Sequence, residues 1–336
     1  MTVKERKRQM KRKIARMMRL GMMLLVVILA GVFVWKIIGN MKRASEEKQK
    51  AKEAAVEQEM RRQEEEEARK EEEKKQEMQE TLDELSIQIN TLLEEVSGTW
   101  SVYVQDLETG AELVINNREM YAASLSKIFV MESVYAHIDE IVANEKARTG
   151  TDDRSVNSEK VQEYLENMIT ISDNESYNEL IRLHSSTLDF TEACEKVDDY
   201  LQQQEYRDTG VYHTLAPSNS GYLYISDIYN HTTVKDCGKI LESIYKKECV
   251  SEEASEEMLD LLLAQERKAK IPSGVPEGIK VANKTGETDE SQHDIAIVFG
   301  EERDYILCVM SYNPSSSAAS VNMIGQISSA VYDALK

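Results

Sequence analysis

Three short groups of polar residues along this chain could together carry out serine chemistry. A serine hydroxyl becomes an effective nucleophile only when a positioned base takes its proton, and Lys127 is the candidate base for Ser124. A lysine can serve as a base only when desolvation or a nearby cation favours its neutral form, and Lys284 could supply that charge. The groups are, in chain order, Ser124-Leu125-Ser126-Lys127, Ser172-Asp173-Asn174 and Lys284-Thr285-Gly286.

The surrounding sequence places these groups at the ends of expected helices and strands. Ser124 precedes the apolar run 128–131, which is typical of a helix start, so the serine and its amide would lie at the positive end of the helix dipole. Lys127 would lie one turn further on and face Ser124. The third group ends the β-prone stretch 279–283, and its Gly286 would let a substrate lie close against the strand edge.

In order and context, the three groups resemble the S-x-x-K, S-D-N and K-T-G motifs of class A β-lactamases and penicillin-binding proteins. The resemblance covers about residues 81–336. It implies an α+β fold, in which an antiparallel five-stranded sheet is flanked by terminal helices and carries an inserted all-helical lobe. The active site would then lie in the cleft between the sheet and the lobe, where ligand sites are common.

The resemblance also implies a role for each residue of the second group. Ser172 would relay a proton toward the leaving nitrogen, Asn174 would bind the amide of the acyl side chain, and Asp173 would brace the loop. We therefore expect the catalytic residues to be Ser124, Lys127, Ser172 and Lys284, and the substrate-binding residues to be Asn174, Thr285, Gly286 and Glu287.

The third group would bind the carboxylate that β-lactams share with peptides ending in D-alanine. By the resemblance, Lys284 and Thr285 would hold this carboxylate, since an ammonium and a hydroxyl on an open strand edge suit an anion. The oxyanion hole would consist of the backbone N–H groups of Ser124 and Glu287. Such a pair of donors stabilises the transition state by a few kcal/mol.

The sequence departs from the class A pattern at the residue expected to activate the deacylating water. Those enzymes carry a loop glutamate after S-D-N, usually within a Glu-x-x-x-Asn run, and no such run occurs between Gln202 and Thr232. Glu205 and Asp208 are the carboxylates in the early part of this loop. Asp208 has the better position, although an ordinary solvated loop aspartate is the simpler interpretation. Acylation is therefore better supported than rapid hydrolysis of the acyl-enzyme.

Three functions agree with these observations. The first is β-lactam hydrolysis, and the second is D,D-carboxypeptidase or transpeptidase action on peptidoglycan stem peptides. The third is a sensor that binds wall fragments or β-lactams without turnover, against which the intact motifs argue. A Ser-His-Asp hydrolase is disfavoured because the chain has no G-x-S-x-G elbow.

The amino-terminal segment predicts a single membrane crossing. Residues 1–19 contain nine Lys or Arg, and residues 20–39 are apolar except for Lys36. Twenty helical residues span about 30 Å, the thickness of a bilayer core. The positive-inside rule places the basic tail in the cytoplasm and everything after residue 40 outside the membrane. A cleaved signal peptide is the alternative, but the run is long and no A-x-A site follows it, and nucleic-acid binding by the tail is a poorer interpretation still.

Residues 40–80 are expected to form a charged helical stalk or linker before a domain spanning 81–336. Pairs such as Glu57 with Arg61 and Glu66 with Lys70 have the i, i+4 spacing that stabilises an isolated helix, whereas a disordered linker is the alternative. A short heptad repeat follows at Met78, Leu82, Leu85, Ile89, Leu92 and Val96. It is too short for a typical coiled coil, so we expect this helix to pack on its own domain, while the oligomeric state stays open.

Within the domain, the pattern alternates between strands and helices. A β-hairpin is expected at 99–116, helices from Ser124 to about Arg267, and a capping box at Thr233. The expected loops within the helical region are 149–158, 172–174 and 208–232; strands are expected at 279–284, 294–299 and 304–312, and a final helix at 318–336.

Charge and composition narrow the choice of partners. The net charge of −20 disfavours polyanions such as nucleic acids. The five histidines show no metal-ligand spacing, so we expect no metal site and no cofactor. The four cysteines lie in the predicted external part, where disulfides are permitted, but buried free thiols are at least as compatible with the sequence.

Overall fold

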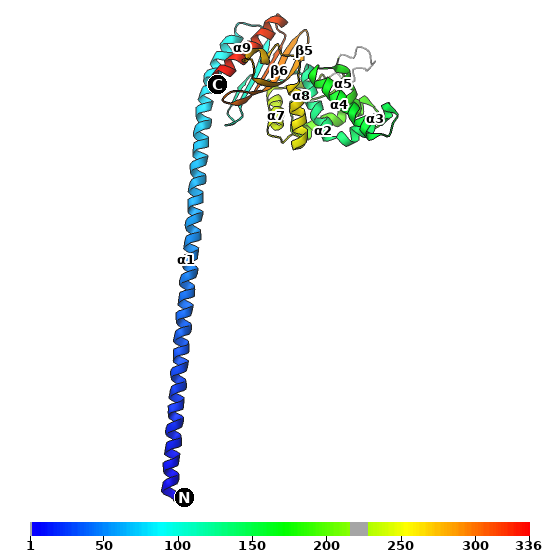
Figure 1. The fold of residues 1–336 in the computed structure, drawn as a ribbon. Helices are drawn as coiled ribbons and strands as arrows, with labels where there is room; N and C mark the ends of the chain where they lie inside the picture. The colour runs from blue at the N-terminus through cyan, green and yellow to red at the C-terminus, as the bar shows by residue number, and fades with distance from the viewer. Residues whose placement is uncertain (1, 216–227) are drawn as a thin grey trace. The chain divides into compact units, whose positions relative to one another are not determined.

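The computed structural model describes residues 2–215 and 228–336, and the chain divides into two compact units, Met1–Glu71 and Glu72–Lys336 (Figure 1). The first unit is part of one long helix, α1 (Val3–Leu93). The apolar side chains between residues 20 and 39 are exposed, and this helix is long and apolar enough there to cross a membrane. The expected ion pairs Arg61–Glu57 and Lys70–Glu66 form at 2.6 and 2.7 Å, so α1 continues through the charged segment.

The second unit is built on a five-stranded antiparallel sheet with the strand order β2-β1-β7-β6-β5. Its strands are β1 (Thr99–Asp106), β2 (Glu112–Ile115), β5 (Lys280–Glu287), β6 (Ser291–Phe299) and β7 (Asp304–Tyr312). The predicted hairpin is formed by β1 and β2, and a separate short sheet pairs β3 (Met120–Tyr121) with β4 (His231–Thr232). As the last strand in the order, β5 has no strand neighbour on its outer edge among the described residues.

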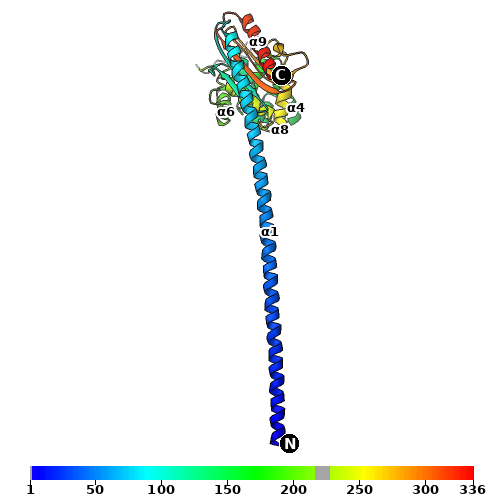
Figure 2. The same cartoon turned by 90° about the vertical axis from the view of Figure 1, so that its left-hand side faces the viewer.

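One face of the sheet is covered by the end of α1 and by α9 (Ser317–Leu335), which Figures 1 and 2 show on the same side. Four of the five α1 residues of the predicted heptad repeat are buried there among sheet residues such as Trp100 and Val309. They are Met78, Leu82, Leu85 and Ile89. The repeat therefore packs onto its own domain.

The other face carries the helical lobe. Its helices are α2 (Ser126–Ala136), α3 (Ile138–Thr149), α4 (Arg154–Thr170), α5 (Asn174–Arg182), α6 (Phe190–Gln203), α7 (Val234–Tyr245) and α8 (Glu252–Leu263). Helix α2 lies inside this layer, and residues Ser126 to Tyr135 are all buried. Thr233 caps α7 by accepting a hydrogen bond from the Asp236 N–H at 3.2 Å, as predicted. The α+β architecture is that expected from the sequence.

Three local details differ from the expectations or complete them. Ser124 lies in a 3₁₀ turn, η1 (Ala123–Leu125), and α2 begins only at Ser126. Residues 216–227 of the expected loop 208–232 lie outside the described residues. All four cysteines are buried free thiols, which selects one of the two alternatives that the sequence left open.

Candidate active site

The η1 turn fixes Ser124 at the amino-terminal end of the buried helix α2. Ala123 immediately before it has a left-handed backbone, with φ of 47°. The Ser126 hydroxyl donates to the Ala123 carbonyl at 2.9 Å and ties the turn to the first residue of α2. A non-glycine residue in this region costs about 1–3 kcal/mol, and such strain is tolerated where the surrounding packing enforces it.

Ser172 lies in the short turn between α4 and α5 and also has a left-handed backbone, with φ of 63°. The turn is fixed on both sides, since the Asp173 N–H donates to the Asn167 carbonyl at 3.0 Å. The Asp173 carboxylate caps α5 by accepting from the Ser176 N–H at 2.7 Å. Asp173 thus braces the loop, and the conformation directs Ser172 toward α2.

Lys127 joins the first two groups of the sequence pattern. Its Nζ lies 2.7 Å from the Ser172 carbonyl and 2.7 Å from Asn174 Oδ1, both of which can only accept hydrogen bonds. The Ser124 and Ser172 hydroxyls lie farther away, at 3.1 and 3.2 Å. A neutral amine has two N–H donors, which match the two carbonyl-type acceptors, and its lone pair is then available for the Ser124 proton.

The surroundings favour this neutral form. Lys127 is fully buried, and burial lowers its pKa from 10.5 to about 7. Among nearby charges, Asp173 opposes this decrease and Arg267 adds to it. A lysine with such a pKa exists in both protonation states near neutrality, as a general base must.

Lys284 reaches the same serine from the sheet. Its Nζ lies 2.8 Å from Ser172 Oγ and 3.0 Å from the Thr285 carbonyl, so the Ser172 hydroxyl lies between two amines. Burial, followed by the charge of Lys127, holds the pKa of Lys284 well below its ordinary value. The structure thus brings Ser124, Lys127, Ser172 and Lys284 into one hydrogen-bonded chain that joins the lobe to the sheet.

A cavity of about 180 Å³ opens onto this chain of groups. Lys127 and Lys284 are buried and do not line it, so they contact it only through the two serines. The lining residues are Ser124, Ser172, Asn174, Arg267, Thr285 and Glu287. The cavity is therefore lined by five of the eight site residues expected from the sequence, and by Arg267, which was not expected.

A sequence model of the β-lactamase enzyme family matches residues 84–335, which is more than half of the chain. The chain belongs to that family. Among curated proteins, no sequence matches it.

Several solved structures share the fold. PBP-A is 21% identical with a TM-score of 0.60, covering 75% of this chain and 95% of that chain. The β-lactamase of Sphaerobacter thermophilus is 21% identical (TM-score 0.60; coverage 75% and 96%), and the TLA-1 extended-spectrum β-lactamase is 19% identical (0.61; 75% and 98%). These similarities show a β-lactamase-like fold.

In this family member, a basic segment beside β5 was missed by the sequence reasoning. Arg267 lines the cavity with a side chain that is 48% exposed. Lys268 donates to Asn283 Oδ1 at 3.2 Å, and Lys270 donates to the His293 carbonyl at 3.0 Å. The available signal for this segment was its charge, because residues 267–270 include three cations in a domain that is otherwise acidic. The segment has no regular pattern, however, that would place it beside the strand.

Glu287 closes the cavity with its own carboxylate. One oxygen lies 3.2 Å from Arg267 Nη1, and the other lies 3.0 Å from Lys270 Nζ. Burial raises the pKa of Glu287, but the charges of Lys270 and Arg267 outweigh burial and hold it below the ordinary value. The carboxylate is therefore ionised at neutral pH and occupies the cationic side of the cavity.

Gly286 is closely packed within the protein. A Cβ at this position would lie 3.2 Å from each of the Ala122 carbonyl oxygen, Leu125 Cγ and His293 Cδ2. The first two belong to the segment that carries Ser124. The turn that carries the nucleophile therefore approaches Gly286 closely, in addition to the close approach of a substrate that the sequence predicts.

His293 is a second positioning residue that the sequence did not reveal. It is fully buried, and burial lowers its pKa to about 4, so the ring is neutral. The Ser311 N–H donates to Nδ1 at 3.2 Å, which leaves the proton on Nε2 to be donated to the Tyr121 carbonyl at 3.0 Å. This bond ties β3, just before Ser124, to the central sheet.

Neither of the two loop carboxylates considered for deacylation lies in the described lining of the cavity. Glu205 and Asp208 are exposed and do not line it. Further along the same loop, Leu215 is held by Asn178 of α5. The Asn178 side chain accepts from the Leu215 N–H at 3.0 Å and donates to the Leu215 carbonyl at 3.4 Å. Glu287 is thus the carboxylate that the described part of the chain contributes to the lining, and it is engaged with two cations.

Proposed function

We propose that this family member is a serine hydrolase in which Ser124 is acylated by β-lactams or by D-Ala-D-Ala-type amides, followed by hydrolysis of the acyl-enzyme. The observation that carries the proposal is the position of Lys127. Its amine lies 3.1 Å from Ser124 Oγ, with both N–H donors matched by acceptors and its pKa lowered to about 7. A solvated helix lysine would have neither property.

Acylation follows from the chain of hydrogen bonds. Ser124 Oγ attacks the substrate carbonyl carbon while its proton moves to Lys127 Nζ, and the N–H groups of Ser124 and Glu287 stabilise the oxyanion. When the C–N bond breaks, Ser172 Oγ donates its proton to the leaving nitrogen. Lys127, 3.2 Å away, returns the proton to Ser172 and becomes neutral again. Lys284 holds the Ser172 hydroxyl from the other side at 2.8 Å.

The substrate carboxylate is assigned to Arg267 together with Thr285. Both line the cavity, whereas the Lys284 amine is buried behind Ser172. A guanidinium forms strong, directed hydrogen bonds with carboxylates. Because Glu287 already contacts Arg267, an incoming carboxylate must share or displace that ion pair.

A second candidate function is D,D-carboxypeptidase or transpeptidase action on peptidoglycan. It is favoured because the Glu287 carboxylate is already paired with cations, and the described lining offers no other carboxylate that could activate water. The acyl-enzyme would then persist until an amine or a slowly activated water attacks it. A solved structure of a PBP-A mutant is an acyl-enzyme complex with penicillin G, so a protein of this fold can hold such an adduct.

The proposal includes membrane anchoring through residues 20–39, with the amino terminus in the cytoplasm and the catalytic domain outside. The exposed apolar side chains of this segment support it, as does the basic tail that precedes them. The charged segment 40–80 would then hold the catalytic domain away from the membrane.

Intact-mass spectrometry of the full chain in detergent, mixed with a penicillin and followed over time, tests the function. We expect a penicillin adduct on the wild type and on Ser186→Ala, which removes an exposed hydroxyl elsewhere in the lobe, but none on Ser124→Ala. A short-lived adduct with accumulating hydrolysed drug would indicate a β-lactamase, and a persistent adduct would indicate the peptidase. No adduct on the wild type would refute acylation of Ser124.

A further inference from the structure

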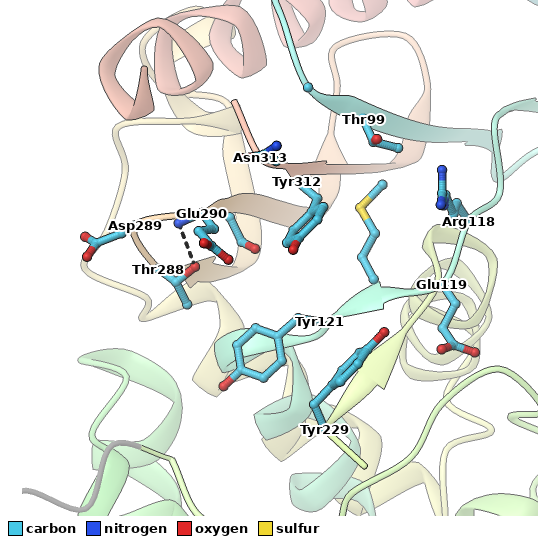
Figure 3. A pocket seen from close by; sticks show the side chains of 13 residues that line it. Thr99, Arg118, Glu119, Tyr121, Tyr229, Thr288, Asp289, Glu290, Tyr312 and Asn313 are labelled. Carbon is cyan, nitrogen blue, oxygen red and sulfur yellow. Dashed lines mark hydrogen bonds between the residues drawn. The ribbon is translucent and has the colours of Figure 1, made fainter. Parts of the chain in front are cut away.

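A second and larger cavity, of about 730 Å³, lies at the end of the sheet (Figure 3). Figure 3 shows the side chains of Tyr121, Tyr229 and Tyr312 around it, with the β5–β6 turn on one side and residues 118–119 on the other. The lining residues that matter for the argument are Tyr121, Tyr229, Tyr312, Glu119, Asp289 and Glu290. None of them belongs to the catalytic set.

The floor of this cavity contains an unsatisfied hydroxyl. Ser291 is 1% exposed, and its Oγ has no hydrogen-bond partner in the described part of the chain. In the sheet, Tyr312 is paired with Ser291 on one side and with Thr99 on the other, so these three side chains point to the same face. Tyr312 points into the cavity in Figure 3, which places the Ser291 hydroxyl on the cavity side as well. A buried hydroxyl without a partner is costly, and a polar ligand would satisfy it.

The charges and rings around the cavity select a cation. Glu119, Asp289 and Glu290 contribute three exposed carboxylates, whereas Arg118 contributes one positive charge. Tyr229 and Tyr312 are 47% and 42% exposed, so their ring faces are accessible to a ligand. Aromatic faces attract ammonium groups, and carboxylates nearby add to that attraction.

The position of the cavity relates it to a particular part of the substrate. Along β5, Thr285 lies at the proposed carboxylate site and Glu287 at the proposed oxyanion hole, and Thr288, the next residue, lines the second cavity. The substrate carboxylate belongs to the leaving group. The acyl part of the substrate must therefore extend in the opposite direction, past Glu287 toward Thr288. On the facing side, Tyr121 lines the same cavity and lies three residues before Ser124.

We propose that the cavity between Tyr121, Tyr229 and Tyr312 is a subsite for a primary ammonium group carried by the acyl part of the substrate. The proposal rests on the function proposed above, because it uses the direction in which a substrate lies along β5. It identifies the preferred substrate as an amine-bearing peptide and gives the unpartnered Ser291 hydroxyl and the three carboxylates a ligand.

Calorimetric titration of the full-length Ser124→Ala variant in detergent tests this subsite without any chemical step. The two probes are Nα-acetyl-L-lysyl-D-alanyl-D-alanine and the same peptide acetylated on its side-chain amine. We expect the free amine to bind about fivefold more tightly, the value of a partly exposed cation–π contact, and the advantage to shrink at high salt. The double change Asp289→Asn with Glu290→Gln leaves the tyrosine rings and Glu119 in place and should reduce the advantage to about twofold.

The matched control is Glu301→Gln with Glu302→Gln, which removes two exposed carboxylates from the β6–β7 turn at the other end of the same strands. It changes the net charge equally, and we expect it to preserve the fivefold advantage. Equal binding of the two peptides, failure of both to bind, or an advantage that is unchanged by removal of Asp289 and Glu290 would overturn the subsite. Penicillin adduct formation on the wild type is measured separately, so failure of the subsite is distinguishable from failure of the proposed function.

Discussion

The lowered pKa of Lys127 predicts how acylation depends on pH. With a pKa of about 7, half of the Lys127 amines are neutral at pH 7, whereas at the ordinary value of 10.5 only about one in 3,000 would be. Burial therefore raises the population of the reactive base by about a thousandfold. Raising the pH removes the proton, so the acylation rate should increase about tenfold per pH unit below pH 6 and become constant above about pH 8.

The assay is the second-order rate of penicillin adduct formation, followed by mass spectrometry between pH 5 and pH 9. The penicillin carboxylate stays ionised over this range, so ligand titration does not contribute. Lys127→Arg should acylate at least about a thousandfold more slowly at every pH, because a guanidinium does not deprotonate in this range. Circular dichroism of both proteins across the same range controls for unfolding.

Two results would refute this reasoning. A rate that is constant from pH 5 to pH 9 would show that proton removal by Lys127 does not limit acylation. A rate that still increases steeply at pH 9 would show that Lys127 keeps an ordinary pKa, and that its burial among Ser172, Asn174 and Ser124 does not favour the neutral amine.

Three further outcomes are expected. Arg267→Gln should raise the half-saturating penicillin concentration about tenfold, the value of one charge-assisted hydrogen bond, with no change for the penicillin methyl ester, as measured by acylation kinetics. Burial raises the pKa of Glu132 to about 7, so the folded protein holds this proton more tightly than the unfolded chain does. The resulting contribution to the free energy of unfolding is lost as the pH rises through 7. Urea unfolding should therefore show that the wild type loses about 2 kcal/mol between pH 5 and pH 8 relative to Glu132→Gln. Gly286→Ala should slow acylation at least about tenfold, because its Cβ would meet the Ala122 carbonyl and Leu125 at 3.2 Å; unchanged acylation would contradict this.

Much of the fold could be predicted because local patterns determine it. Alternation of apolar residues located the hairpin of β1 and β2, and the capping residue Thr233 located the start of α7. The repeat beginning at Met78 identified a helix that packs on its own domain. Each of these features depends on residues close together in the sequence, for which spacing alone indicates the structure.

The two cavities could not be predicted in the same way. Arg267 lies between α8 and β5 in a segment without periodicity, and only tertiary packing brings it to the cavity beside Thr285. The second cavity takes its tyrosines from three separate segments, at residues 121, 229 and 312. The left-handed backbone of Ser172 was also not evident, because a serine gives no signal for it, unlike a glycine.

The site combines features that each destabilise the folded chain. The left-handed Ala123 and Ser172 carry backbone strain. Lys127 and Lys284 are buried, and the described part of the chain gives neither of them a carboxylate as a hydrogen-bond partner. A carboxylate in contact with Lys127 would relieve the cost of burial, but it would also stabilise the ammonium form and remove the base. The absence of such a partner in the described surroundings of Lys127 is therefore what reactivity requires. The buried helix α2 and the central sheet must supply the stability that this arrangement costs.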